Sequence, residues 1–243
     1  MTIKEFSDSF DTRVSAWAQK AGFGDTLPDA LVFDEYEKSV FLTEAQDSLV
    51  LDYYEGNTAP AFEEKERTRE ALDALVDTYV TSTEVTGHAQ IVADGRHLSK
   101  LFAIPESLLW IIVEQATYGD VPCCPRLSNK TVRVIPLKHD EYHRALDNPF
   151  RGPSKNRVLR LNATNNIVEL VSDYPIGSYT LRYVKQPNPI ILVNLSDGVT
   201  IRNESTESTG SLPDFLHEEI LSRAVMFALK SRSYLSTKGE RQQ

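Results

Sequence analysis

One long amphipathic segment, residues 34–56, constrains the fold of this chain more than any other feature. Its sequence, DEYEKSVFLTEAQDSLVLDYYEG, repeats apolar residues at spacings of three and four, which is typical of an α-helix. Asp34 predicts the N-cap, Glu37 completes a capping box, and Gly56 predicts the C-terminal end. The apolar band contains Phe33, Tyr36 and Val40 in one stripe, Leu42, Ala45, Leu49 and Tyr53 in the next, and Phe41, Val50, Leu51 and Tyr54 beside them. A band this wide predicts a helix that contacts more than one neighbour.

Three further segments have the spacing of helices. Residues 2–20 begin with a capping box of Thr2 and Glu5 and carry apolar residues at intervals of three and four. Residues 62–79 begin with the charged run EEKERTRE and end in an apolar stretch. Residues 213–235 form the last predicted helix, with cations near its C-terminal end, where the helix dipole favours them.

The pattern changes near residue 80, and the middle of the chain favours β-strands. Predicted strands cover residues 100–104, 107–118, 131–137, 157–162, 167–172, 178–185 and 190–193. The run LLWIIVEQATY, inside residues 107–118, also fits a short helix, but its β-branched content favours a strand. The turn residues of segment 163–166 predict a hairpin, and residues 139–146 predict a short helix.

Helices at both ends of the sequence and strands between them predict an α+β fold. The expected architecture is a helical core formed by the N-terminal helices and the C-terminal helix, with an inserted β-rich subdomain. The expected parts are residues 1–80, residues 81–195, and residues 196–243, in which a loop precedes the closing helix. Two polar segments, 147–156 and 195–210, lack a regular pattern, and the second is expected to be a mobile loop.

The charge of the chain is distributed unevenly. Residues 1–90 carry 19 acidic and 7 basic side chains, a net charge of −12, whereas residues 91–243 carry 16 acidic and 19 basic side chains, a net charge of +3. A domain that grips nucleic acid is usually basic, so specific binding to DNA or RNA is disfavoured. An acidic surface can instead serve as a wall that repels phosphate.

The sequence gives no indication of a membrane segment or a secretory signal. No stretch approaches the roughly 20 apolar residues of a membrane helix, and the N-terminus, MTIKEFSDSF, lacks an apolar core segment. Cys123 and Cys124 are the two cysteines, and adjacent cysteines rarely pair with each other. We interpret them as reduced thiols of an intracellular product.

No residues form a recognisable catalytic, cofactor-binding or metal-binding constellation. His139 and His143 would lie on one helical face at the spacing of a zinc pair, but no third ligand is indicated, and solvated histidines are the favoured interpretation. A nucleophilic Cys123 or Cys124 would need an activating base, and the flanking sequence DVPCCPRLS offers only Arg126 and suggests a rigid, buried loop.

The acidic clusters have a structural explanation. Asp34, Glu35 and Glu37, and the acids of segment 63–66, lie at predicted helix starts, where capping and the helix dipole favour carboxylates over acid–base chemistry. The sequence also lacks a phosphate-binding glycine loop, a G-x-S-x-G elbow and an H-E-x-x-H pair. We therefore predict that the chain is not an enzyme.

Four phrases, in this order, carry a resemblance to a known family. They are the segment DEYEKSVFLTEAQDSLVLDYYEG, the block VRVIPLKHDEYHRALDNPFRGPSKNRVLRL, the phrase YTLRYVKQPNPIIL and the closing LPDFLHEEILSRAVMFALKSR. Together they resemble neck or tail ring proteins of tailed bacteriophages with short tails, most closely those of the crAss-like gut phages. The resemblance to the tail tubular (gatekeeper) adaptor that sits below the portal is more distant.

The resemblance implies a virion protein that is made in the host cytoplasm and forms a dodecameric ring in the neck or tail. It also implies packing against the portal or another ring, a bounded path for double-stranded DNA without specific binding, and no enzymatic activity. Such a ring closes by heterologous contacts, so each subunit needs two different lateral faces. Segments 147–156 and 195–210 are the candidates for contacts. The alternatives are a tail-fibre or tail adaptor module, and an unrecognised hydrolase, which would need a concave pocket with convergent polar groups.

Overall fold

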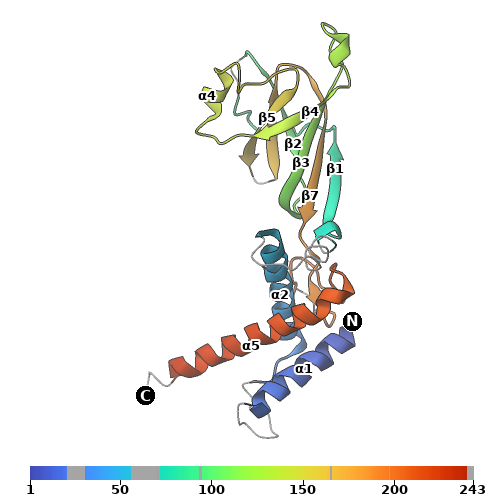
Figure 1. Ribbon diagram of the computed structural model, residues 1–243, viewed down its shortest axis with the longest axis vertical. Helices are drawn as coiled ribbons and strands as arrows, with labels where there is room; N and C mark the ends of the chain where they lie inside the picture. The colour runs from blue at the N-terminus through green and yellow to red at the C-terminus, as the bar shows by residue number, and fades with distance from the viewer. Residues whose placement is uncertain are drawn as a thin grey trace. The chain divides into compact units, whose positions relative to one another are not determined.

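The computed structural model describes residues 1–20, 31–55, 70, 72–92, 95–164, 166–196 and 198–239. The chain divides into two compact units. One contains Met1–Leu75 and Pro187–Gln243, and the other contains Val76–Gln186. We call them the helical unit and the β unit. Helices from both ends of the sequence and a β-rich segment between them make an α+β fold, which confirms the predicted fold class (Figure 1).

The helical unit is built from three long helices and a small sheet. Its helices are α1 (Ile3–Lys20), α2 (Glu35–Glu55) and α5 (His217–Gly239), and the short 3-10 helix η3 (Asp214–Leu216) leads into α5. The strands β8 (Ile190–Ile191) and β9 (Ser208–Thr209) pair antiparallel. The helix predicted over residues 34–56 is confirmed as α2, although Gly56 lies outside the described residues.

Both predicted capping boxes are present. In α1 the Thr2 amide donates to Glu5 Oε2 at 2.8 Å, and the Glu5 amide donates to Thr2 Oγ1 at 3.3 Å. In α2 the Glu37 amide donates to Asp34 Oδ1 at 2.7 Å, and the Asp34 amide donates to Glu37 Oε2 at 3.4 Å. These bonds satisfy main-chain donors that the first turn of a helix leaves without partners.

The three helices bury a shared apolar core. Its members include Phe6, Phe10, Val14, Leu42, Leu49, Ile220, Leu221 and Ala224. Some apolar residues of these segments are substantially exposed instead, namely Trp17, Tyr36, Leu51, Tyr54 and Phe215.

A stripe of polar residues on α2 is buried, although the sequence pattern did not predict it. Ser39, Thr43 and Gln46 are spaced by four and three residues, so they share one helical face. They bind the main chain of residues 188–192. The Leu192 amide donates to Ser39 Oγ at 2.9 Å, the Ile190 amide donates to Thr43 Oγ1 at 3.1 Å, and Gln46 Nε2 donates to the Asn188 carbonyl at 2.8 Å. This polar stripe fixes β8 on α2.

The helix predicted over residues 62–79 is wrong at its C-terminal end. Residues 62–69 lie outside the described residues, and residues 70, 72 and 73 are helical, but Val76–Thr81 is the strand β1. This strand pairs antiparallel with β7 over all six residues. Its sequence, VDTYVT, is rich in β-branched and aromatic residues, and pairing with a distant strand outweighs the helical spacing that precedes it.

The β unit is one mixed seven-stranded sheet with the order β1-β7-β3-β4-β5-β6-β2. Its further strands are β2 (Leu98–Ala103), β3 (Leu108–Tyr118), β4 (Thr131–Pro136), β5 (Arg157–Thr164), β6 (Ile167–Ser172) and β7 (Ile176–Lys185). All neighbours pair antiparallel except β4 and β5, which are parallel. The strand interpretation of residues 107–118 is therefore confirmed, and so is the β5–β6 hairpin, in which Asn166 has a φ of +62°.

The curled sheet encloses the main core of the β unit. Phe102, Tyr118, Tyr179 and Leu181 are fully buried there. Glu169, which is also fully buried, accepts the amides of Ile91 and Val92 at 2.7 and 3.0 Å and so fastens the segment before β2 to the sheet. The short helices of this unit are η2 (Pro125–Leu127) and α4 (Tyr142–Leu146).

Candidate assembly surfaces

The loop of residues 147–156 is well ordered and presents an aromatic side chain to solvent. The Gly152 amide donates to the Asn148 carbonyl at 2.7 Å, and the Phe150 amide donates to Asn148 Oδ1 at 2.8 Å. Arg157 Nε donates to the Gly152 carbonyl at 2.9 Å. Phe150 at the tip is 86% exposed, the highest exposure among the large apolar residues of the described chain. A fixed main chain that holds an exposed phenyl ring favours a contact with another protein.

The segment of residues 195–210 is folded, so the expected mobile loop is wrong. It contains β9 and a tight turn in which Arg202 and Asn203 have φ values of +55° and +65°. The Ile201 and Glu204 main chains bond to each other, and Arg202 forms an ion pair with Asp47 on α2. Local hydrogen bonds and this ion pair order a segment whose polar composition resembles that of a free loop.

The net negative charge of the chain is concentrated in the helical unit. It contains 24 acidic and 13 basic residues, a net charge of −11, whereas the β unit contains 11 acidic and 13 basic residues, a net charge of +2. These values together give the net charge of −9 for the whole chain.

Several of the cations in the helical unit are held in ion pairs between helices. Arg13 on α1 pairs with Glu218 on α5, Arg223 pairs with Asp52, and Arg232 pairs with Glu37. These three arginines pair with only a few of the 24 acidic side chains of the unit, so the unit keeps its net negative charge.

Lys38 is a buried cation within this network. Its Nζ donates to Asp11 Oδ2 at 2.7 Å and to Glu35 Oε1 at 2.9 Å. Burial acts to lower the pKa of Lys38, but the hydrogen bonds to Asp11 and Glu35 outweigh it and raise that pKa. The acidic residues at the start of α2 therefore act in capping and ion pairing, as expected, while the acids of segment 63–66 lie outside the described residues.

A buried polar cluster lies in the β unit beside a groove. Glu114 Oε1 accepts from Arg160 Nη1 at 2.6 Å and from the Tyr179 hydroxyl at 2.5 Å. Burial, followed by the charge of Glu114, raises the pKa of Tyr179 far above its usual range. The groove has a volume of about 600 Å³ and is lined by β3, β4 and Arg160. Because Arg160 and Tyr179 already occupy the carboxylate, this cluster lacks the free acid–base pair of a hydrolase site.

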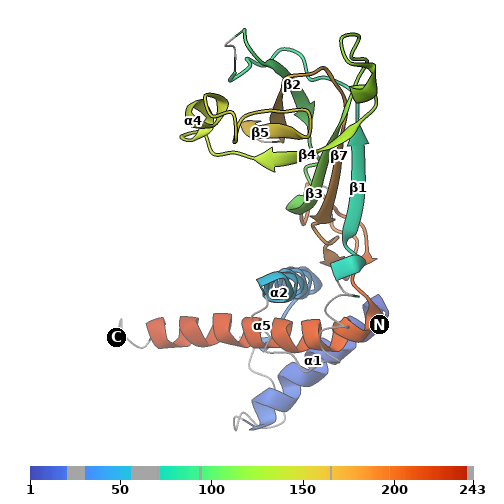
Figure 2. The same cartoon turned by 45° about the horizontal axis from the view of Figure 1, so that its top comes forward.

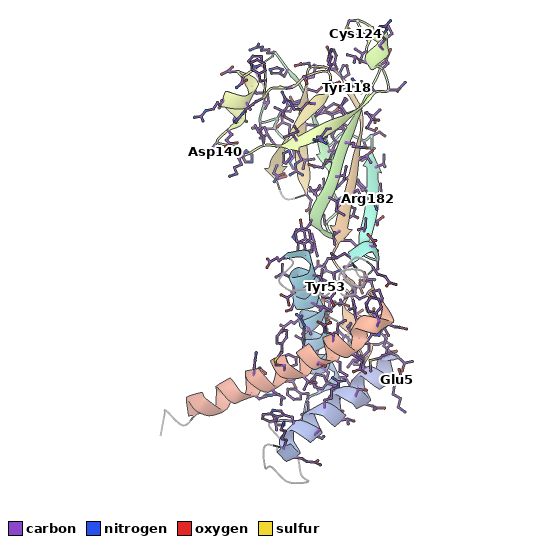
Figure 3. All side chains as sticks on the ribbon, viewed as in Figure 1. Glu5, Tyr53, Tyr118, Cys124, Asp140 and Arg182 are labelled. Carbon is purple, nitrogen blue, oxygen red and sulfur yellow. The ribbon has the colours of Figure 1, made fainter. Side chains whose placement is uncertain are left out.

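The structure does not bring the remaining chemically interesting residues together. His139 lies in the turn before α4 and His143 lies inside α4, so the two do not share one helix, as the disfavoured zinc pair would require. Both side chains are exposed, which agrees with the favoured interpretation as solvated histidines. Cys123 is exposed, which contradicts the expected buried loop, and both cysteines are free thiols. A hydrogen bond with Cys123 raises the pKa of Cys124, which disfavours the nucleophilic thiolate. Figure 3 shows Cys124 and Asp140, which marks the segment before α4, at separate places in the β unit.

The described residues show neither a cluster of metal ligands nor a helix that could span a membrane. Within the described ranges, no group of three or more His, Cys, Asp or Glu residues is placed to hold a metal ion. Among the helices the structure describes, none combines the length and apolar character that a membrane span requires.

Comparison with known proteins defines the class of this chain. The family model of phage tail ring protein 3/4 matches residues 1–240. Ring protein 3 of Bacteroides phage crAss001 is 44% identical over 241 residues, which covers 97% of this chain and 98% of that protein. Ring protein 4/5 of the same phage is 31% identical over 247 residues, which covers 94% of this chain and 92% of that protein.

The chain belongs to the phage tail ring protein 3/4 family. It is therefore a structural protein of a bacteriophage virion, and the predicted resemblance to crAss-like ring proteins is confirmed. For such a protein the relevant surfaces are those that join subunits. Segments 147–156 and 195–210 were predicted as contacts because they lack a regular sequence pattern, whereas neither the polar stripe of α2 nor the groove of the β unit was predicted.

Proposed function

We propose that copies of this chain form a ring in the neck or tail of the virion, where it connects the portal to the tail and bounds the path of the DNA. The observation that carries this proposal is family membership over almost the entire chain, which includes both the helical unit and the β unit. In this proposal the ring is a dodecamer, it contacts the portal and adjacent tail proteins, and it has no enzymatic activity. The protein is made in the host cytoplasm and ends in the neck or tail.

The charge of the helical unit supports the role in DNA passage. A net charge of −11 on this unit favours repulsion of phosphate, so DNA would slide past it without specific binding. We propose that acidic surface of the helical unit faces the lumen. A density map of the assembled ring tests this directly, and a lumen lined mainly by Lys and Arg side chains would contradict it.

The mass of the purified full-length chain tests the ring. Light scattering and native mass spectrometry, with and without a portal ring from the same phage, are expected to give a closed ring of about a dozen subunits. A chain that stays monomeric in both conditions would refute the ring.

A tail-fibre or tail adaptor module is the second candidate. Phe150, 86% exposed on an ordered loop of the β unit, favours it because a rigid aromatic tip suits docking to a partner. This candidate predicts a monomer that binds a fibre protein and loses that binding in Phe150→Ala. The ring proposal predicts that Phe150→Ala leaves the mass of the ring unchanged unless this loop joins subunits.

A further inference from the structure

One edge of β3 runs beyond the strand that covers it. β3 pairs with β7 from Leu108 to Tyr118, but β4 pairs with β3 only at residues 115–117. β4 then turns away to pair in parallel with β5, as Figure 2 shows. Residues 108–114 of β3 therefore lie outside the pairing with β4, and we call them the acceptor edge. Alternate residues of a strand direct their main-chain N–H and C=O groups to either side, so this stretch directs half of them away from β7.

The acceptor edge borders a groove with apolar and charged side chains. The groove, about 600 Å³, lies between residues 108–114 and a second wall formed by Arg133, Val134 and Pro136 of β4 and by Arg160 of β5. Ile112 is 49% exposed and Val113 is 44% exposed. Residues 108–113 contain no charged side chain. Soluble proteins usually protect a sheet edge with charge or proline, so an apolar edge of this length indicates a surface that another strand covers.

The opposite end of the sheet offers a strand of matching length. β1 has six residues, and its pairing is with β7 alone among the described strands. Val80 on β1 is 62% exposed, and Asp77 is the one charged residue of the strand. β2, at the other end of the sheet, is less suitable because the Val85 amide already donates to its Leu101 carbonyl.

The charges of the two edges are complementary. β1 carries the carboxylate of Asp77, and the groove carries the guanidinium groups of Arg133 and Arg160 against the single carboxylate of Glu114. Two β-bulges in β3, near residues 108–110 and 111–113, make the acceptor edge irregular. Irregular edges discourage pairing with arbitrary strands, so the partner has to fit one register.

We propose that β1 of one subunit pairs with the acceptor edge of β3 in the next subunit, so that the β1-β7-β3 sheets join around the ring. The proposal rests on the ring of the proposed function and names its lateral contact. The contact is heterologous, because it uses a different surface on each side, as ring closure requires.

The direction of the new pairing follows from the sheet. β1 and β3 are both antiparallel to β7, so they run in the same direction within one subunit. A ring of about a dozen copies rotates each subunit by only about 30° relative to the next. The direction is therefore retained, and β1 and the neighbouring β3 pair in parallel.

Paired cysteines test this contact in the full-length chain. Cys123 and Cys124 are first replaced by serine. Val80→Cys is then combined with Ile112→Cys in one double variant and with Val113→Cys in another. Either position on the acceptor edge can lie close enough to β1 for a disulfide. After mild oxidation of the assembled protein, we expect a ladder of covalent multimers from at least one double variant. A mixture of the two single variants should give dimers and nothing larger, since each subunit then carries one half of the link.

A charge inserted into the acceptor edge provides an independent readout. Ile112→Lys should abolish the ring in mass measurements while the far-UV circular dichroism of the subunit is retained. Leu98→Lys is the matched control, because Leu98 on β2 is 50% exposed and should tolerate the change with the ring intact.

Each other outcome overturns the proposal. Rings that form but give no covalent ladder in either double variant, or that persist in Ile112→Lys, would refute the strand contact and leave the proposed ring standing. Covalent dimers from Val80→Cys alone would show that β1 pairs with β1 in a two-fold contact. A wild-type chain that forms no ring, with or without the portal, would refute the ring and this contact together.

Discussion

Gly210 is a position at which the main chain passes close to the polar stripe of α2. Its φ is +82°, a conformation that L side chains rarely adopt, and an added Cβ would lie 2.5 Å from Gln46 Oε1 and 3.0 Å from Ile190 Cγ1. Backbone strain alone would cost roughly 1–3 kcal/mol. We predict that Gly210→Ala lowers the free energy of unfolding by more than this, because the added Cβ also meets Gln46 and Ile190. Urea denaturation of the full-length chain measures this change.

Gly198 separates the backbone strain from the steric contact. Its φ is +87°, yet an added Cβ would meet nothing within 4 Å. Gly198→Ala should therefore show the strain alone and be the milder of the two substitutions. Equal losses in both variants would mean that the contact with Gln46 is unimportant.

His217 makes the stability of the helical unit depend on pH. The side chain is 3% exposed, its ring packs against Phe6, and its Nδ1 lies 2.9 Å from the amino group of Met1. Burial, and then the positive charge of that amino group, lower the pKa of His217 below the ordinary value of 6.5. The unfolded chain therefore binds a proton at this site more readily than the folded chain does, and stability is lost as the pH falls through 6.5 towards the folded pKa.

We predict that His217→Gln loses less stability on acidification than the wild type does, because the variant lacks the imidazole. The free energy of unfolding is measured at about pH 7.5 and about pH 5.5, and the difference should be smaller in His217→Gln than in the wild type. His88→Gln, at an exposed position, is the control and should retain the wild-type difference. An unchanged difference in His217→Gln would assign the pH dependence to other groups.

At the scale of elements, the contact between α2 and β8 depends on hydroxyl and amide side chains. Thr43 Oγ1 accepts the Ile190 amide at 3.1 Å and donates to the Ile190 carbonyl at 3.3 Å, and all of these groups are buried. Thr43→Val keeps the shape of the side chain but leaves both main-chain groups without this partner. We predict a loss of about 1–3 kcal/mol in the free energy of unfolding, measured by thermal or urea denaturation.

Thr12 on α1 provides the comparison for Thr43. Its Oγ1 donates to the Asp8 carbonyl within the same helix at 2.7 Å, and the side chain is exposed. Because water can replace this bond, Thr12→Val should change stability by only a few tenths of a kcal/mol, roughly. If both variants lost a similar free energy of unfolding, the hydrogen bonds between Thr43 and β8 would contribute no more to stability than the exposed bond of Thr12.

Elements set by local interactions were predictable from the sequence, and elements set by distant partners were not. The capping boxes at Thr2 and Asp34 depend on residues three positions apart, so the sequence contains all of the information. β1 depends on β7, about a hundred residues away in the sequence. The helical spacing of the residues before β1 therefore led to the wrong prediction of a helix. Ser39, Thr43 and Gln46 did carry a signal, since polar residues at helical spacing interrupt an otherwise apolar band.

The same distinction applies to the candidate surfaces. Segment 147–156 was predictable as a surface because its Asn, Pro and Gly residues mark a turn wherever the chain lies. The acceptor edge was not, because it exists only where β4 leaves β3 to join β5, and no local pattern records where two strands separate.

At the scale of the whole molecule, the β unit has the connections of an inserted domain. Val76 at its start pairs with Val184 near its end, so the chain enters and leaves at neighbouring points. We predict that a fragment of residues 76–186 folds alone, with dispersed amide signals in NMR spectra and a cooperative thermal transition.

A shifted fragment gives the matched test of these boundaries. Residues 81–195 lack most of β1 and include β8, whose partners Ser39 and Thr43 lie on α2. This fragment should be less stable than residues 76–186, because it loses five of the six residue pairs between β1 and β7 and exposes a strand that belongs to the helical unit. If the shifted fragment were the more stable one, the division of the chain at residue 76 would be wrong.

The polar stripe of α2 also affects how this protein can change over generations. Its bonds to residues 188–192 end on main-chain amides and carbonyls, which almost every amino acid supplies. Substitutions in that segment therefore preserve the bonds to α2 as long as the side chains stay apolar, because Ile190, Ile191 and Leu192 are buried. The exceptions are proline at positions 190 and 192, where the missing N–H would remove the bond. The attachment to α2 thus tolerates exchanges among apolar residues in this strand.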